Sequence, residues 1–307
     1  MVVNTERESP SHNKMKRGDS RYVVPLVVSP WLRELLVDPI SKRPFIEQTV
    51  TDFKASCGFI YRYKYGVPDF RVRLTIGSER WLAAQQTFES WMEEYFSNGE
   101  ADLMFYRLEQ ERDRPVYEVM RLTGRVLDVG GQLGHIRKYM ELGQEYCSVD
   151  PFIRAHLLAK GKKNLFASYP IEYPLNLVGG FGEFLPFRDG CFDTVNMRSC
   201  LDHFFNPEFA LLEAYRVLKR NGKLIIGVSI EEESLKVKLK EIVRPIISIF
   251  CHRYRIQHLS HFSYEAVIKI CKLCGFELDK EIWQTDDILY ASFTRRNECI
   301  IASGQQL

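Results

Sequence analysis

A glycine-rich turn followed by an acidic residue is the feature of this sequence best suited to chemistry. The strand-like run 125–129 leads into Gly130-Gly-Gln-Leu-Gly134, and Asp150 follows the next strand-like run, 145–149. A glycine turn between a strand and a helix brings backbone N–H groups close to a ligand, and an acidic side chain one strand later can accept both ribose hydroxyls. The pattern predicts a site for a nucleoside-containing ligand, with a plain tight turn as the alternative.

Four motifs in order resemble those of a known enzyme family. Asp128-Val-Gly-Gly-Gln-Leu-Gly134 is similar to the D-x-G-x-G-x-G motif of class I methyltransferases, and the segment Glu183-Phe-Leu-Pro-Phe-Arg-Asp-Gly-Cys-Phe-Asp193-Thr-Val195 resembles E-x-L-P-F-x-D-x-x-F-D-x-V of the methyltransferase type 11 family. Leu201-Asp-His203 and the segment 213–222 resemble the L-x-H and E-x-x-R-V-L-K-P-G-G stretches that follow. The resemblance implies an α/β fold with a doubly wound Rossmann-like sheet, and S-adenosyl-L-methionine as cofactor and methyl donor.

The resemblance also implies which residues hold the donor. The first motif lies beside the donor's amino acid end, and the acidic residue after the second strand holds the ribose. The stretch 181–183 lies along the adenine, and Leu185 supplies an apolar wall beside it. The implied cofactor-binding residues are Asp128, Gly130, Gly131, Gly134, Asp150, Phe181, Gly182, Glu183 and Leu185.

Two positions depart from the family pattern. Gln132 occupies the place where many relatives carry the second glycine. If position 132 needs a left-handed backbone, the strain costs about 1–2 kcal/mol. Micromolar binding corresponds to about 8 kcal/mol, so this strain would weaken the ligand site without abolishing it. Phe181 stands where relatives often place an acidic residue for the adenine amino group.

His203 is the candidate catalytic residue, with Asp202 as the second candidate. A sulfonium donor is already activated, so methyl transfer mainly needs an acceptor held in line, and a general base helps only when the acceptor must lose a proton. His203 falls just past the predicted fourth strand, near the sheet edge where ligands bind. The alternative is a loop histidine that packs or caps.

The segment after the N-terminal tail resembles a second family. Trp31–Phe45, Cys57-Gly58 and Tyr65–Arg71 are similar to the short zinc-ribbon-like domain that activates some tRNA methyltransferases. Structural zinc needs four Cys or His ligands, but Asp38 and Ser41 occupy the first expected pair and leave only Cys57. We therefore expect this module to keep the fold without metal, as an apolar docking piece.

Two further patterns bear on ligand binding. Gln86-Thr-Phe-Glu-Ser-Trp91 is similar to a helix that lies over the donor pocket in such fused enzymes, and simple packing on the domain is the alternative.

His258, His261, Cys271 and Cys274 have residue types that zinc uses. The two cysteines fall in an amphipathic helix, where small buried thiols explain them better, so we predict no metal site.

The elements that position these residues follow from periodicity and capping. Apolar residues at helical spacing predict a helix over 79–96, and alternating strands and helices after it predict a parallel sheet with crossover helices. We expect a disordered tail over 1–21, a β-rich zinc-ribbon-like module over 22–77, a helical linker over 78–123 and the donor-binding domain over 124–307. Predicted strands cover 23–28, 58–65, 70–76, 125–129, 145–149, 191–197, 224–228, 276–283 and 288–295, and further helices cover 114–121, 135–141, 152–160, 206–219 and 263–275.

Composition limits the remaining possibilities. The chain of 307 residues has a formal charge of +2, so no global field favours nucleic acid or an anionic membrane. No apolar run approaches the ~20 residues that span a bilayer, no leader pattern opens the chain, and the eight cysteines are scattered. We expect a cytoplasmic protein with reduced thiols, no membrane insertion and no nucleic-acid partner.

These observations predict an S-adenosylmethionine-dependent methyltransferase acting on a small-molecule, lipid or glycan acceptor, with the helix over 79–96 and the segment 235–263 on the acceptor side. Two alternatives stay open. A non-catalytic methyltransferase-like subunit would bind a protein partner through the N-terminal module. An NAD-dependent oxidoreductase also uses a glycine turn and an acidic residue, but gives the segment 183–195 no role. The oligomeric state stays open.

Overall fold

The structure is a computed structural model that describes residues 28–72, 79–97, 103–132, 134–154, 176–231 and 260–296. Its elements in chain order are α1 (Pro30–Leu35), β1 (Glu47–Gln48), β2 (Asp52–Lys54), β3 (Ile60–Lys64), β4 (Val67–Asp69), α2 (Glu79–Ser97), α3 (Leu103–Met120), β5 (Arg125–Val129), η2 (His135–Tyr139), β6 (Glu145–Asp150), β7 (Asn176–Gly179), η3 (Gly182–Phe184), β8 (Phe192–Arg198), η4 (Leu201–His203), α6 (Pro207–Val217), β9 (Leu218–Ser229), α9 (Tyr264–Leu273), β10 (Phe276–Trp283) and β11 (Ile288–Arg295).

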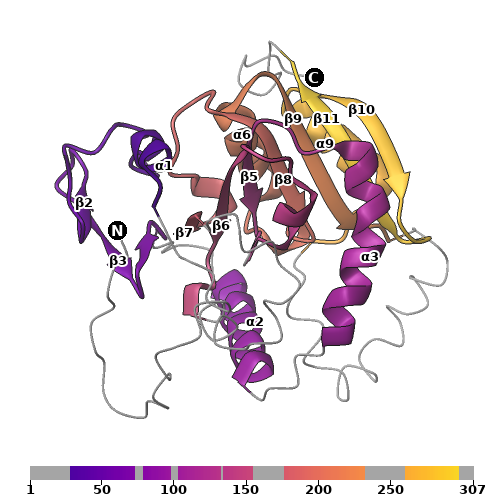
Figure 1. Cartoon of the computed structure of the whole chain (residues 1–307), viewed down its shortest axis with the longest axis horizontal. Helices are drawn as coiled ribbons and strands as arrows, with labels where there is room; N and C mark the ends of the chain where they lie inside the picture. The colour runs from indigo at the N-terminus through magenta and orange to yellow at the C-terminus, as the bar shows by residue number, and fades with distance from the viewer. Residues whose placement is uncertain are drawn as a thin grey trace.

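The described strands form one mixed sheet in the order β1-β2-β3-β4-β7-β6-β5-β8-β9-β11-β10 (Figure 1). The strands from β7 to β9 are parallel, and β11 and β10 return antiparallel at the far edge. Successive side chains of a strand face opposite sides of a sheet, so each strand supplies two packing faces. The predicted doubly wound α/β class is confirmed.

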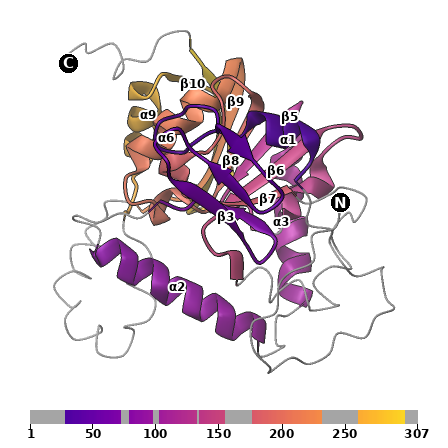
Figure 2. The same cartoon turned by 90° about the vertical axis from the view of Figure 1, so that its left-hand side faces the viewer.

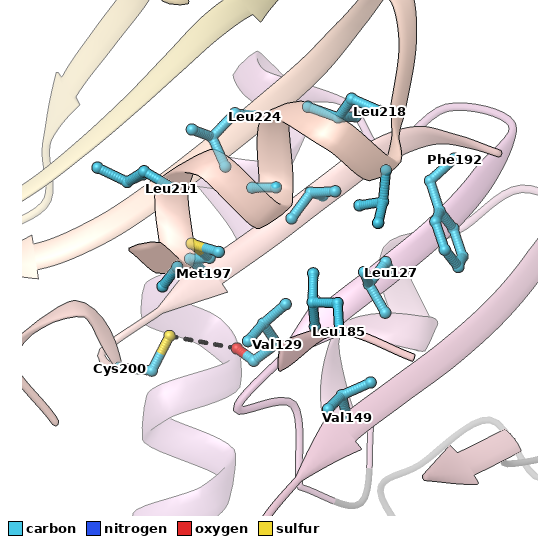
Figure 3. Packing of buried hydrophobic residues seen from close by; sticks show 14 of the residues in the cluster. Leu127, Val129, Val149, Leu185, Phe192, Met197, Cys200, Leu211, Leu218 and Leu224 are labelled. Carbon is cyan, nitrogen blue, oxygen red and sulfur yellow. Dashed lines mark hydrogen bonds between the residues drawn. The ribbon is translucent and has the colours of Figure 1, made fainter. Parts of the chain in front are cut away.

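Each face of the parallel strands is covered by different helices. Leu127 and Val129 of β5 pack in one buried cluster with residues of α6 and α9, and Figure 3 shows part of this packing. Val126, on the other face of β5, packs in a second cluster with Tyr117 of α3 and Ile136 of η2. The alternation along β5 therefore separates the two helical layers.

The N-terminal strands extend the same sheet. Strand β4 pairs antiparallel with β3 and parallel with β7, where Asp69 is opposite Gly179. Leu32 and Phe53 belong to the same buried cluster as the β5 residues that face α6. Figure 2 shows these strands from the side, with α2 lying apart from the other helices. The segment 29–71 is thus packed on the parallel sheet through both hydrogen bonds and apolar contacts.

Several predicted boundaries need correction. The helix expected over 135–141 is the 3₁₀ helix η2, and the helix expected from residue 114 begins at Leu103. The helix expected over 206–219 is α6, which ends at Val217, and the chain continues directly into β9. The strand β4 (Val67–Asp69) ends before the strand expected over 70–76, residues 70–72 are not in a strand, 73–76 lie outside the described residues, and β7 was missed. Residues 1–27, most of 152–160, and 232–259 with His258 lie outside the described residues.

Two helices begin at side-chain caps. The Asn206 side chain accepts a hydrogen bond from the N–H of Phe209 at 3.0 Å, and Ser263 accepts one from Ala266 at 3.3 Å. Side-chain oxygens at these positions satisfy N–H groups that the first helical turn leaves without partners. Among the described residues, the helices are too short or too polar to span a membrane.

Candidate functional site

A pocket of about 570 Å³, counted with its open mouth, lies at the carboxyl ends of the parallel strands. In open α/β sheets this edge, where strand order reverses, is the usual ligand site. The pocket is lined by Trp81, Gln85, Phe88, Val129, Gly130, Gln132, Val149, Asp150, Pro151, Phe152, Gly180, Phe181, Gly182, Glu183, Ser199, Cys200, His203 and Phe204.

Asp150 and the glycine turn meet at this pocket. The carboxylate of Asp150 accepts a hydrogen bond from the backbone N–H of Gln132 at 3.3 Å and another from Phe152 at 2.8 Å. The Gly130 N–H donates to the carbonyl of Val149 at 2.8 Å, which ties the turn to β6. The two features that the sequence predicted to cooperate therefore face one cavity.

The turn needs its glycines for two physical reasons. Gly130 and Gly134 have φ angles of 72° and 71°, a conformation that side chains disfavour. A Cβ on Gly130 would lie 2.9 Å from the Cβ of Cys200, and one on Gly131 would lie 2.4 Å from the carboxyl carbon of Asp128. Glycine therefore lets the turn pack closely against Cys200 and against Asp128 of β5.

Asp128 lies beneath the turn and outside the pocket lining. Its carboxylate accepts hydrogen bonds from Asn196 at 2.7 Å and from the Tyr146 hydroxyl at 2.8 Å. Burial raises the pKa of Asp128, against these hydrogen bonds. Gly131 and Gly134 also lie outside the lining. These three residues shape the turn from below.

The stretch after β7 is divided between the pocket and the core. Phe181, Gly182 and Glu183 line the pocket, but Leu185 is fully buried in the cluster shown in Figure 3. A Cβ on Gly182 would lie 2.6 Å from the Phe204 ring, so the chain passes close to that aromatic wall. Leu185 is thus a core residue where the sequence predicted a wall of the site.

Glu183 holds the loop that follows η4. Its Oε1 accepts hydrogen bonds from the backbone N–H groups of Phe205 at 2.7 Å and Asn206 at 3.2 Å. Burial raises the pKa of this carboxyl group, although the backbone donors oppose the shift. The carboxylate therefore fixes the segment leading from η4 into α6.

Helix α2 contributes one side of the pocket. Trp81, Gln85 and Phe88 fall on one helical face and all line the cavity. The Trp81 indole lies 5.0 Å from the Phe181 ring, and the Phe88 ring lies 5.2 Å from Phe152. The helix around the Gln86-to-Trp91 motif thus lies over the pocket.

His203 and Asp202 are placed differently. His203 lines the pocket, and its ring packs against Phe88 with 5.1 Å between centroids. Asp202 is half-buried and lies outside the lining. His203 therefore lines the same cavity as the glycine turn, whereas Asp202 does not line this cavity.

Sequence reasoning missed Ser199 and Cys200. Both line the pocket just after β8, and Ser199 has a φ of 50°, unusual for a residue other than glycine. The Cys200 thiol donates to the carbonyl of Val129 at 3.2 Å, the contact drawn in Figure 3. Their position immediately after a parallel strand was the available signal.

The residues weighed as metal ligands have other contacts. Asp38 accepts hydrogen bonds from the Ser41 hydroxyl at 2.6 Å and the Tyr61 hydroxyl at 2.8 Å. His261 pairs with Glu231 at 2.7 Å, and Cys271 and Cys274 are buried thiols at α9. Within the part of the chain that the structure describes, no three His, Cys, Asp or Glu residues are grouped to hold a metal ion.

Comparison with known proteins places this site in a family context. Residues 127–226 match the family model described as a methyltransferase domain. The chain is 34% identical over 96 residues to an uncharacterized protein of Methanocaldococcus jannaschii, covering 31% of this chain and 43% of that protein. It is 36% identical over 101 residues to the ubiquinone/menaquinone biosynthesis C-methyltransferase UbiE of Xylella fastidiosa, covering 32% and 40%.

Among solved structures, a methyltransferase of Thermotoga maritima described as a possible histamine N-methyltransferase gives a TM-score of 0.49 at 20% identity, covering 69% of this chain and 100% of that one. Residues 127–226, which run from β5 into β9, are thus similar to a methyltransferase domain. The chain spans less than half the length of the two curated relatives named above.

Proposed function

We propose that the whole chain is an active methyltransferase that binds S-adenosyl-L-methionine in this pocket and methylates an O, N or C atom of a small-molecule, lipid or glycan acceptor. One observation carries the proposal: the Asp150 carboxylate and the bend at Gln132 are joined by a 3.3 Å hydrogen bond and line the same cavity. The UbiE relatives, named as C-methyltransferases, support the reaction class.

The pocket has features that fit the donor. Gly130 and Gly182 let the pocket backbone pass close to Cys200 and Phe204, because a Cβ would lie only 2.9 Å and 2.6 Å from these side chains. Asp150 is placed to accept the ribose hydroxyls, because its carboxylate lines the cavity at the end of β6. Phe181 and Gly182 offer an apolar surface for the adenine, in place of the acidic residue of many relatives. When bound, the donor supplies a methyl group already activated on a sulfonium.

The remaining catalytic work is positioning and proton removal. The ring of His203 reaches the cavity, and Phe88 packs against it. We assign His203 as the general base for acceptors that lose a proton, a contribution of roughly 10²–10⁴-fold. Asp202 is the second candidate for this role.

The N-terminal segment is included in the proposal as a metal-free relative of the zinc-ribbon-like domain. The turn 38–41 is held by hydrogen bonds from Ser41 and from the N–H of Ile40 to the Asp38 carboxylate. Tyr61, on β3, donates to the same carboxylate. These bonds replace the cross-link that a metal would provide. The proposal includes a cytoplasmic location, supported by the free thiols of the described cysteines.

Isothermal titration calorimetry tests the donor claim. We expect micromolar binding of S-adenosylmethionine and S-adenosylhomocysteine by the full chain, and a loss of at least about tenfold in Asp150→Ala, since the ribose hydroxyls lose a charged acceptor. Asp189→Ala is the matched control, because the Asp189 side chain is 76% exposed and paired with Arg216. Unchanged binding in Asp150→Ala would contradict the proposal.

A donor-labelled activity screen then separates an enzyme from a non-catalytic subunit. Gln132, with its left-handed φ of 48°, is the observation that favours the subunit. Label transfer to any acceptor in cell extracts supports the enzyme. Donor binding without transfer, together with a stable protein complex on co-purification, supports the subunit.

A further inference from the structure

Arg71 ties the N-terminal segment to the loop that follows β6. Its guanidinium binds the Asp69 carboxylate twice, with Nε donating to Oδ1 at 2.8 Å and Nη2 donating to Oδ2 at 2.7 Å. The third guanidinium nitrogen, Nη1, donates to the backbone carbonyl of Pro151 at 2.8 Å. Because bidentate pairing fixes the plane of a guanidinium, the donor that reaches Pro151 has a set direction.

The partner of Arg71 is anchored to the sheet that carries the pocket. Asp69 is the last residue of β4 and lies opposite Gly179 of β7. The N–H of Phe70 donates to the carbonyl of Gly179 at 2.7 Å, and the N–H of Gly180, a pocket residue, donates to the carbonyl of Asp150 at 3.3 Å. The carboxylate that holds the guanidinium is therefore fixed relative to the ends of β7 and β6.

One peptide group connects Arg71 to the Asp150 carboxylate. The peptide between Pro151 and Phe152 accepts from Arg71 through its oxygen, and its N–H, which belongs to Phe152, donates to Asp150 Oδ1 at 2.8 Å. A planar peptide holds its C=O and N–H groups in fixed relative directions, so a bond that holds the oxygen also orients the N–H. Hydrogen bonds in such a chain polarise and strengthen one another. The guanidinium thus acts on the carboxylate through this peptide.

The surroundings of Arg71 keep it charged and paired. The side chains of Arg71 and Asp69 are 22% and 18% exposed. Burial would lower the pKa of Arg71, but the hydrogen bonds and charge of Asp69, together with the charge of Glu89 on α2, raise it. Most surface ion pairs contribute little, and a bidentate pair between arginine and a carboxylate is the exception. The guanidinium is therefore a persistent link at this junction.

We propose that Arg71 is a positioning residue for the methyl donor, which orients the Asp150 carboxylate toward the ribose hydroxyls through the peptide group after Pro151. This inference rests on the proposed function. The other carboxylate oxygen, Oδ2, accepts only a longer bond of 3.3 Å from the N–H of Gln132. Arg71 lies outside residues 127–226, which match the methyltransferase domain. The affinity of that domain for the methyl donor therefore depends on the N-terminal segment.

A double-mutant cycle in the full chain, with S-adenosylhomocysteine binding measured by calorimetry, tests this inference. Arg71→Met keeps an unbranched side chain without the guanidinium, and Asp150→Ala removes the carboxylate that the guanidinium orients. We expect Arg71→Met alone to weaken binding about fivefold, the effect of one hydrogen bond. In the Asp150→Ala background the same substitution should change the affinity by less than about twofold, because residues that act through one another are not additive.

Arg33→Met is the matched control for Arg71→Met. Arg33 lies in the same N-terminal segment and donates to the carbonyl of Thr49 and to the hydroxyl of Tyr63, both at 3.0 Å. Both partners belong to the N-terminal segment, so the substitution removes bonds of an arginine that does not reach the pocket. We expect it to lower the midpoint of thermal unfolding and to leave the affinity for S-adenosylhomocysteine within about twofold.

Three outcomes overturn the inference. Arg71→Met could bind S-adenosylhomocysteine as tightly as the unsubstituted chain, or Arg33→Met could weaken binding equally, which would indicate a general loss of stability. Arg71→Met could also weaken binding by the same factor with and without the Asp150 carboxylate, so that the two residues act independently. Failure of the unsubstituted chain to bind, or unchanged binding in Asp150→Ala, would instead refute the proposed function.

Discussion

The indole N–H of Trp81 donates a hydrogen bond to the backbone carbonyl of His203 across 3.0 Å, joining residues 122 positions apart in sequence. The Gln85 side chain donates to the same carbonyl at 3.1 Å, one helical turn further along α2. Two donors from one helix thus converge on one peptide group of η4. Helix α2 is therefore coupled to the short helix that carries the candidate base.

The first prediction concerns this coupling. Trp81→Phe keeps an aromatic ring near Phe181 but removes the indole N–H. We expect the dissociation constant for S-adenosylhomocysteine to rise about fivefold, the effect of one neutral hydrogen bond, while Gln85 still holds the carbonyl. The change in tryptophan fluorescence on ligand binding is also expected to shrink strongly.

The matched control is Trp283→Phe. Trp283 ends β10, stacks on Tyr264 at 6.2 Å and lies outside the pocket lining. Its substitution should leave both the affinity and the fluorescence response unchanged. If Trp81→Phe behaves like this control, α2 does not contribute to donor binding.

Local patterns explain which parts of the fold could be predicted. The strands 125–129, 276–283 and 288–295 match β5, β10 and β11, because apolar runs bounded by turn residues are visible within a short window. Strand β7 was missed because Asn176-Leu-Val-Gly179 is four residues long, and its pairing with β4 and β6 depends on distant segments. Pro115 hid the start of α3, since proline usually begins a helix and here lies inside one.

The residues of the candidate site also differ in whether a local sequence pattern could predict them. The glycine turn and Asp150 could be found because each follows a strand, and parallel strands place their carboxyl ends at one edge. The convergence of Trp81 and Gln85 on His203 depends on packing between distant segments, which no local pattern reports. Leu185 was assigned to the pocket from motif position alone, but it points into the core.

A second prediction follows from the buried carboxyl group of Glu183. Burial raises its pKa above the ordinary value, so the folded chain binds a proton more readily than the unfolded chain. The free energy of unfolding should therefore increase as the pH falls from neutral through the folded-state pKa, for this group alone. Glu183→Gln keeps an oxygen acceptor for Phe205 and Asn206 and removes the titration.

Urea unfolding at pH 7.5 and pH 5.5 measures this effect. At the higher pH, Glu183→Gln is expected to be as stable as the unsubstituted chain or slightly more stable. At the lower pH that relative advantage should decrease, because the raised pKa lets the native carboxyl group take up a proton more readily than the unfolded one. An identical difference at both pH values would show that Glu183 does not titrate in this range.

A third prediction concerns Asp113, which is fully buried on α3. Arg198 Nη2 lies 2.9 Å from its Oδ2, Gln284 donates to its Oδ1 at 2.9 Å, and His135 Nε2 lies 3.7 Å away. Burial would raise the pKa of Asp113, but His135 and the charge of Arg198 hold it below its ordinary value. This cluster joins α3 to η2, to the end of β8 and to the hairpin between β10 and β11.

Asp113→Asn should lower the free energy of unfolding by about 3–5 kcal/mol near pH 7, because it removes the buried carboxylate that pairs with Arg198 at 2.9 Å. The contribution of Asp113 is present above its unfolded-state pKa and is lost as the pH falls through its lower folded-state pKa. The loss of stability caused by Asp113→Asn should therefore become smaller near pH 3. Glu277→Gln, in an exposed pair with Arg296, is the control and should change stability by less than about 1 kcal/mol. Equal effects of the two substitutions in urea unfolding would contradict this assignment.

The last prediction concerns the junction between the N-terminal segment and the parallel sheet. Leu36 is fully buried and forms an isolated bridge with Phe187. On either side, Val37 donates to the carbonyl of Pro186 and Arg188 donates to that of Leu35, both at 2.9 Å. Because Leu36 shares a core cluster with Leu127 of β5, the two parts of the chain should unfold together.

Leu36→Ala should lower the free energy of unfolding by about 2–5 kcal/mol, through lost burial and the cavity that remains. The unfolding curves from far-ultraviolet circular dichroism and tryptophan fluorescence should shift together, since Trp31 packs against Arg125 at 5.0 Å and reports on the same junction. Ile40→Ala, in the same segment but 60% exposed, should change stability by less than about 0.5 kcal/mol. An independently folding module would instead give an early fluorescence transition while the circular dichroism of the sheet and helices stays unchanged, because only local contacts would then depend on Leu36.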